Sequence, residues 1–231
     1  MAARLTAVTF DAHDPGPLAS FWGSLLDREV VAEADRALLP AEDTQVALRF
    51  VAAPTDKPGA NRLHLHLTST SLEDQRRTVA TALRLGGRHL DVGQLPEERH
   101  VVLADPEGNE FCVIEPDNGF LAGCGHLGEV SCDGSRTVGL FWRDALGWRL
   151  VWDQDGETAV QSPAGGTKVS WGGPPVPPHH GRSRQRFDLV AADPATEVAR
   201  LVGLGATRLD DTDGGVELGD PDGNEFCLTQ A

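Results

Sequence analysis

Residues 105–112 read DPEGNEFC, and residues 220–227 read DPDGNEFC. The second stretch repeats the first with one conservative change, and the period from residue 105 to residue 220 is 115 residues. A second pair supports the repeat, because the letters FW at 21–22 are answered by FW at 141–142. A period this long indicates a duplicated domain, since solenoid repeats usually run about 20 to 50 residues.

The duplication divides the chain into two domains. A length of 231 residues suits two domains of about 100 to 120 residues, each able to bury a modest core. The sequence PDNGFLAGCG at 116–125 breaks the strand pattern with turn-forming residues. We therefore predict domains at residues 1–117 and 126–231, joined by a linker at 118–125.

Apolar periodicity predicts the same order of elements in both copies. Predicted helices cover 15–26, 72–85, about 136–146 and 194–204. Predicted strands of the first copy cover 4–10, 28–33, 37–39, 45–52, 62–68, 88–92, 100–104 and 110–115. Each copy therefore contains two βαβββ units.

The repeated motif has a structural role on physical grounds. Pro106 fixes φ, Gly108 permits a positive φ, and the side chains of Asp105 and Asn109 can cap the turn. We expect these residues and their counterparts in the second copy to launch the last strand in a fixed register rather than to take part in catalysis.

A helix that ends in FWRDALGW at 141–148, followed later by a strand that starts after DPDGN at 220–224, carries a family resemblance. The chain resembles the glyoxalase-like, bleomycin-resistance and extradiol-dioxygenase (vicinal oxygen chelate) superfamily over nearly its whole length, twice. The resemblance implies an α+β fold of tandem glyoxalase-like domains. Each would consist of two βαβββ units forming a cupped sheet, with helices on the convex side and a ligand or metal inside the cup.

Composition narrows the classes of partner. The net charge of −15 disfavours nucleic acid and anionic membranes and attracts small cations. The four cysteines form no CxxC pair, and the N-terminus enters a strand pattern without an apolar signal core, so a cytoplasmic location is expected. We expect a small-molecule ligand as the partner, and the protein as a monomer or homodimer.

Strand parity selects the residues that face the cups. In RLHLHL at 62–67 the leucines take the face that packs on helices, so both histidines face the cavity. Tryptophans near strands of the second copy can form an aromatic wall for a small ligand, whereas Trp22 and Trp142 are expected in the helix core. The candidate ligand-binding residues are Arg49, His64, His66, Glu110, Cys112, Trp152, Trp171, Arg186, Asp188, Glu225 and Cys227.

The resemblance also implies where a metal would be held: by a His early in the first strand, by His or Glu on later strands, and by a Glu four residues after the turn glycine. That last position holds Cys112 and Cys227, and the first-strand position falls at Thr6 or Ala7 and at His126 or Leu127. The fourth-strand carboxylate falls near Arg49 and Ser170.

Neither copy reproduces the family's ligand pattern, and a mononuclear metal needs three or four convergent ligands. No metal or other cofactor is therefore expected, and a divalent Zn, Ni, Mn or Fe ion is the alternative. The remaining metal candidates are His64, His66, Glu110 and His126, with Glu129 a further donor of the second copy.

Three functional hypotheses follow. The leading one is a glyoxalase-like protein of the resistance or sequestration type that binds a small organic molecule without a tightly held metal. The alternative is a metal-dependent lyase, isomerase or dioxygenase of the same superfamily with a rearranged site. In the third, one copy only completes the fold of the other. The loop with His179 and His180 is interpreted as a solvated linker rather than a basic flap.

Overall fold

The computed structural model describes residues 3–32, 35–42, 44–54, 57, 59–178, 181–212 and 214–231, so His179 and His180 lie outside the described residues. Four helices begin and end within one residue of the predicted positions: α1 (Pro15–Leu26), α2 (Leu72–Arg84), α3 (Arg136–Leu146) and α4 (Pro194–Leu204). None of the helices in the described ranges is long and apolar enough to span a bilayer.

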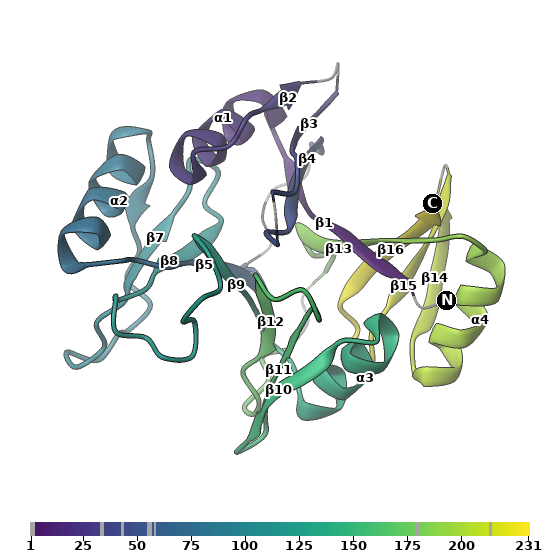
Figure 1. The fold of residues 1–231 in the computed structure, drawn as a ribbon. Coiled ribbons are helices and arrows are strands. Elements are labelled where there is room, and N and C mark those ends of the chain that lie inside the picture. The colour runs from purple at the N-terminus through teal and green to yellow at the C-terminus, as the bar shows by residue number, and fades with distance from the viewer. Residues whose placement is uncertain are drawn as a thin grey trace.

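Each helix follows the first strand of a βαβββ unit (Figure 1). The first copy consists of unit 1, with β1 (Arg4–Ala12), β2 (Val31–Ala32), β3 (Arg36–Leu39) and β4 (Ala47–Ala52), and unit 2, with β5 (Leu63–Leu67), β6 (Arg88–His89), β7 (Val101–Ala104) and β8 (Glu110–Val113). The second copy consists of unit 3, with β9 (Leu127–Cys132), β10 (Arg149–Gln154), β11 (Glu157–Gln161) and β12 (Lys168–Trp171), and unit 4, with β13 (Gln185–Ala191), β14 (Thr207–Thr212), β15 (Gly215–Gly219) and β16 (Glu225–Gln230).

Two eight-stranded sheets result, and each joins units from different copies. Sheet A has the order β14-β15-β16-β13-β1-β4-β3-β2, and sheet B has the order β10-β11-β12-β9-β5-β8-β7-β6. The joints are the antiparallel pairs β1–β13 and β5–β9. The α+β class and the βαβββ units are confirmed. The pairing differs from a sheet closed within each copy, because units 1 and 4 share one sheet and units 2 and 3 the other.

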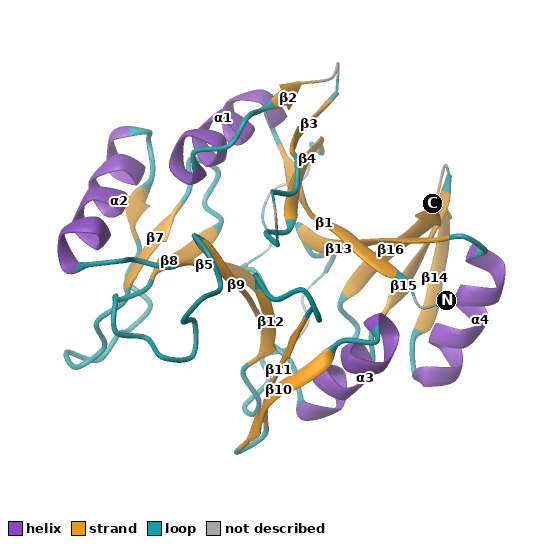
Figure 2. Cartoon of the chain, in the orientation of Figure 1, coloured by secondary structure: helices purple, strands orange, loops and turns teal. Residues whose placement is uncertain are grey.

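The helices lie on the outer sides of the sheets (Figure 2), and each copy has its own set of contacting aromatic rings. The fully buried ring of Trp22 on α1 lies 6.0 Å from Phe10 of sheet A and 5.0 Å from Phe111 of sheet B. In the second copy the ring of Trp142 lies 5.0 Å from Phe187. A core therefore forms between halves of both sheets in each copy. The domain limits at 117 and 126 stay a prediction.

The repeated motif ties the units of one copy together. Asp105, which is fully buried, accepts hydrogen bonds from the backbone N–H groups of Glu107 and Asn109 and from Nε1 of Trp22, at 3.0, 2.9 and 3.1 Å. Gly108 has φ +87°, the conformation that the turn requires. Asp220 repeats these contacts in the second copy, with Nε1 of Trp142 at 3.2 Å. The motif is structural, as the sequence predicted.

Candidate functional site

The predicted strand parity holds on β5. Leu63, Leu65 and Leu67 belong to the buried core, while His64 and His66 are half-buried on the opposite face. That face of sheet B, opposite the helices, is called here the sheet B cup. The equivalent face of sheet A is the sheet A cup.

His66 and Glu129 form the centre of the sheet B cup. The two residues are register partners across β5 and β9, and Nδ1 of His66 lies 2.7 Å from a carboxylate oxygen of Glu129. On the other side, Cys112 of β8 is the register partner of His66. The centre of this cup therefore needs both copies of the repeat.

Electrostatics favour the charged form of this pair. Burial alone would lower the pKa of His66, but hydrogen bonds with Cys112 and Glu129 raise it to about 10. Burial raises the pKa of Glu129 and its bond with His66 lowers it, with a net lowering. His64 behaves oppositely, because burial lowers its pKa. The two imidazoles of one strand thus hold different charge states at neutral pH.

A pocket of about 410 Å³ opens beside this pair. Its aromatic side is made by Trp152, which is 37% exposed, and by Phe120, whose ring lies edge-on to the indole at 5.9 Å. Nζ of Lys168 lies 4.2 Å from the Phe120 ring centroid. The pocket is lined by His66, His100, Ile114, Asn118, Phe120, Leu121, Glu129, Ser131, Trp152, Glu157, Thr158, Ser170, Trp171 and Gly172.

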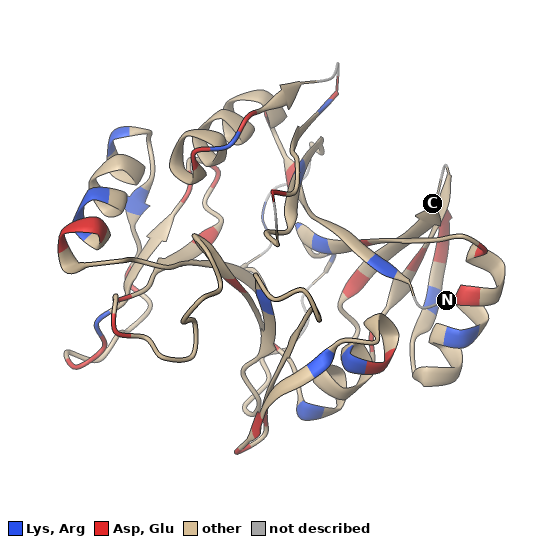
Figure 3. Cartoon of the chain, in the orientation of Figure 1, with Lys and Arg blue, Asp and Glu red and all other residues tan. Residues whose placement is uncertain are grey.

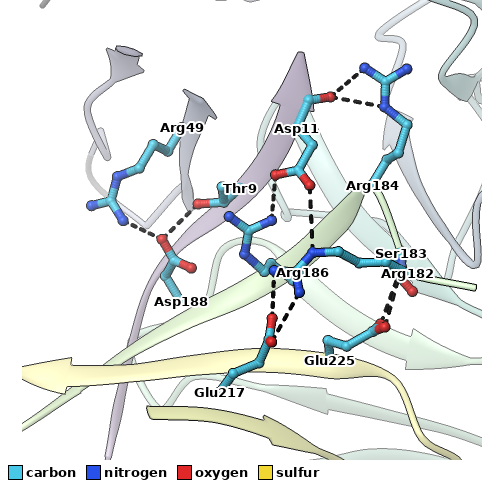
Figure 4. A network of polar contacts seen from close by, with 10 residues as sticks. All are labelled: Thr9, Asp11, Arg49, Arg182, Ser183, Arg184, Arg186, Asp188, Glu217 and Glu225. Atoms are coloured by element: carbon cyan, nitrogen blue, oxygen red, sulfur yellow. Dashed lines mark hydrogen bonds and ion pairs between the residues drawn. The ribbon is translucent and has the colours of Figure 1, made fainter. Parts of the chain in front are cut away.

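The sheet A cup is occupied by its own ion pairs (Figure 4). Asp188 pairs with Arg49 from the first copy and accepts a hydrogen bond of 2.6 Å from Oγ1 of Thr9. Beside them lie the pairs Arg186–Asp11 and Arg182–Glu217, each at 2.6 Å. Both basic and acidic segments lie on the strands of this sheet (Figure 3). The charges of this cup are thereby largely matched.

The structure divides the candidate residues between the two cups. Arg49 lies in the sheet A cup rather than beside the histidines of its own copy, with Arg186, Asp188, Glu225 and Cys227. In the sheet B cup, Glu110 contacts Lys57 and accepts a bond from the Asn61 N–H at 3.2 Å. Glu225 accepts bonds from the Ser183 N–H at 3.3 Å.

Two sequence interpretations need correction. Trp171 lines the pocket with Trp152 but offers almost no exposed surface to it, because it is 1% exposed and its indole stacks on that of Trp142, with centroids 6.4 Å apart. The first-strand position in the second copy is not His126 or Leu127 but Glu129, the register partner of His66. The pairing of β5 with β9 is regular from Leu63 to His66, and it places Glu129 opposite His66.

The residues of both cups do not fit a tightly held metal ion. Within the described ranges, no three His, Cys, Asp or Glu side chains converge as metal ligands do. A metal binds the neutral imidazole, whereas the pKa of His66 favours the imidazolium. In the sheet A cup the Arg49 guanidinium occupies the side of Asp188 that a cation would take. No reaction step is therefore derived through a metal.

Comparison with known proteins identifies the family. The family described as glyoxalase-like domain matches residues 7–114 and 129–229. The chain belongs to the glyoxalase-like domain family. No curated protein is significantly similar to this glyoxalase-like protein in sequence.

Solved structures agree with the fold. Glyoxalase I from Zea mays is 14% identical with a TM-score of 0.67, and the match covers 99% of this chain and 92% of that one. A proposed dioxygenase from Bacillus subtilis subsp. subtilis str. 168 is 12% identical with a TM-score of 0.59, covering 99% and 85%. At these identities the likeness extends to the fold alone.

Several polar residues of the cups are not among the candidates selected from the sequence. Thr9 and Asp11 lie on β1 facing Asp188 and Arg186, and Ser131 faces the sheet B cup from β9. Alternation along LGEVSC at 127–132 places Glu129 and Ser131 on one face and carried this signal.

Proposed function

We propose that this glyoxalase-like protein binds a small organic molecule in the sheet B cup without a tightly held metal ion. One contrast carries the proposal: the sheet B cup opens into a pocket of about 410 Å³, whereas the charged groups of the sheet A cup pair with one another. That volume lies in the range of about 300 to 1,000 Å³ typical of small-molecule sites. Sheet A then acts mainly as a structural partner.

The lining defines the kind of ligand. The exposed edge of Trp152 and the ring of Phe120 offer contact area to a flat apolar body. Ser131 and Ser170, register partners on β9 and β12, offer hydroxyl groups beside it. With Glu157 at the pocket and a net charge of −15, a planar aromatic molecule carrying a positive charge fits best. Such binding is of the resistance or sequestration type.

Calorimetry tests this proposal. Planar aromatic antibiotics and cationic glycopeptides are titrated into the whole protein, and intrinsic tryptophan fluorescence is followed in parallel. A Trp152→Ala variant should weaken binding by at least about tenfold, because an aromatic anchor of this kind contributes more than about 1.4 kcal/mol. Val151→Ala, an exposed neighbour outside the pocket lining, is the matched control. Absence of binding across both ligand classes would remove the sequestration function.

The metal-dependent alternative has its own test. The protein is purified without chelators and its content of Zn, Ni, Mn and Fe is measured. The proposal expects no stoichiometric metal in the wild type. A stoichiometric ion that disappears in His66→Ala would replace the proposal with a metal-dependent lyase, isomerase or dioxygenase.

The proposal also includes the oligomeric state of the protein and its location in the cell. Both sheets are completed within one chain, which supports a monomer over a homodimer. The cysteines Cys112, Cys124, Cys132 and Cys227 are free thiols, which supports a reducing cytoplasm. Light scattering on the purified protein tests the first point.

A further inference from the structure

A second pocket lies where the two sheets meet, next to the sheet A cup, with Arg182 in its lining. Its volume is about 170 Å³. Asn61, Arg62 and Asp133 contribute to it from the ends of β5 and β9 of sheet B, and Arg182 and Gln185 contribute from the start of β13 of sheet A. The pocket therefore draws on both copies of the repeat.

Arg62 enters this pocket with unused hydrogen-bond donors. Nη1 donates to the carbonyl oxygen of Pro177 at 3.0 Å. Nε and Nη2 are buried and have no hydrogen-bond partner among the residues that the structure describes. These two nitrogens form one edge of the guanidinium, which matches a carboxylate in bidentate geometry. A buried cationic edge without an acceptor is costly, so a missing acceptor is implied.

The equivalent arginine in the internal repeat, Arg184, indicates what kind of acceptor Arg62 lacks. Arg62 stands four residues before His66, as Arg184 stands four residues before Asp188, and both cup residues pair in register with the cysteine of the repeated motif. Arg184 is 4% exposed and fully engaged. It donates to the Asp11 carbonyl oxygen at 3.1 and 2.6 Å and to the carboxylate of Glu107 at 2.8 Å.

The equivalent carboxylate in the second copy is one methylene shorter. Glu107 of DPEGN is replaced by Asp222 of DPDGN. Asp222 accepts hydrogen bonds from N–H and Oγ–H of Ser135, at 2.6 and 3.1 Å, and does not accept one from the buried Nε or Nη2 of Arg62. Glu107 keeps the corresponding backbone bonds, to the N–H groups of His13 and Asp14, and still reaches its arginine. The shortening leaves Arg62 without its carboxylate.

A second unpartnered side chain faces the same pocket. Gln185 is 5% exposed, and within the described ranges neither its Oε1 nor its Nε2 has a hydrogen-bond partner. At the equivalent position of the first copy stands the apolar Leu63. Asp133, which follows β9, adds a carboxylate to the lining. The pocket thus offers donors at Arg62 and acceptors at Gln185 and Asp133.

We propose that this junction pocket binds a small carboxylic acid that also carries a hydroxyl or amino group. The carboxylate accepts from Nη2 of Arg62, as Glu107 accepts from Nη2 of Arg184, and also from the buried Nε, which in Arg184 donates to the Asp11 carbonyl instead. The hydroxyl or amino group donates to Gln185 or Asp133. A volume of about 170 Å³ holds on the order of five water molecules, so the ligand is smaller than the one proposed for the cup. This site does not depend on the function of the cup.

Calorimetry with three small probes tests the chemistry of the pocket. Glycolate has both groups, acetate lacks the hydroxyl, and ethylene glycol lacks the carboxylate. Glycolate should bind more tightly than acetate, and ethylene glycol should not bind. Arg62→Met, which keeps the apolar stem, should weaken glycolate binding at least about tenfold. Trp152→Ala should leave it unchanged, which separates this site from the cup.

A single added methylene gives the sharpest test. Asp222→Glu recreates the first copy's arrangement, so the new carboxylate should pair with Arg62 and abolish glycolate binding while the urea midpoint stays the same or rises. Asp210→Glu, at an exposed position on β14, is the control and should bind glycolate as the wild type does. The proposal is overturned if the wild type does not bind glycolate, or if Arg62→Met and Asp222→Glu bind it unchanged.

Discussion

Nδ1 of His66 lies 2.7 Å from a carboxylate oxygen of Glu129, across the strand pair β5–β9 that joins the two copies of the repeat. The side chain of Glu129 is 7% exposed and that of His66 is 19% exposed, so little water screens the pair. The charged centre of the sheet B cup therefore depends on residues 63 positions apart.

This contact predicts that His66 remains an imidazolium at neutral and mildly alkaline pH. Its pKa is raised to about 10, whereas burial lowers the pKa of His64. In an NMR titration of the ring protons, the His66 resonance should stay at its protonated shift at about pH 8, and that of His64 at its neutral shift. A His66 midpoint near 6.5 would contradict the ion pair.

Replacing the Glu129 carboxylate by an amide isolates the contribution of its charge to the pKa of His66. In Glu129→Gln the hydrogen-bond geometry can persist without the negative charge, and the desolvation of His66 then weighs more heavily. The pKa of His66 should fall well below its wild-type value. Glu157→Gln, at the rim of the same pocket, serves as the control and should change it little.

The same pair makes stability depend on pH. The folded-state pKa of His66 is above its unfolded value of 6.5, so its contribution is fully present below about pH 6.5 and is lost as the pH rises through about 10. Over this window the difference in unfolding free energy between wild type and His66→Gln should shrink by up to about 1.4 kcal/mol per pH unit. Urea unfolding at several pH values measures it, and a constant difference would refute the linkage.

The stability of the protein should be sensitive even to an isosteric substitution of Asp105. One oxygen of Asp105 accepts from two backbone N–H groups, and the other accepts from Trp22 and Asn109 side chains. In Asp105→Asn one oxygen becomes an amide NH₂ that faces donors. The loss should be about 3 kcal/mol, close to that of Asp105→Ala, and is read from the urea midpoint. Asp117→Asn, which is exposed, should change the midpoint by less than about 0.5 kcal/mol.

Local sequence signals predicted the local structure well. The Asp-Pro start of α1 and the glycine after α3 fixed both helices at the predicted residues, and leucine alternation placed His64 and His66 on the face away from the core. The same alternation in KVSW at 168–171 puts Trp171 on the face of Val169, which is where the structure has it. The aromatic-wall interpretation of Trp171 overlooked that signal.

The sequence could not predict which strands pair with one another, for a physical reason. The apolar faces of β5 and β9 are buried equally well whichever unit lies beside them, so periodicity does not distinguish a sheet within one copy from a sheet between copies. The sequence therefore selects Arg49 as a cavity residue without saying which cup it enters, and in the structure it pairs with Asp188. The register of β9 against β5 likewise depends on the partner strand, and it places Glu129 rather than His126 opposite His66.

Substitution by alanine should have opposite effects on stability at two helical glycines. A Cβ at Gly139 of α3 would lie 1.9 Å from Oγ1 of Thr158 on β11, whereas a Cβ at Gly203 of α4 would meet nothing within 4 Å. Gly139→Ala should force α3 away from the sheet and cost about 1 to 3 kcal/mol, as overpacking does. Gly203→Ala should stabilise the protein by up to about 1 kcal/mol through helix propensity.

The free energies of urea unfolding of the two variants test this prediction. Equal effects would show that α3 does not pack this closely on β11. If the clash is the cause, the double variant Gly139→Ala with Thr158→Gly should recover part of the loss, because it removes the side chain that the new methyl group meets.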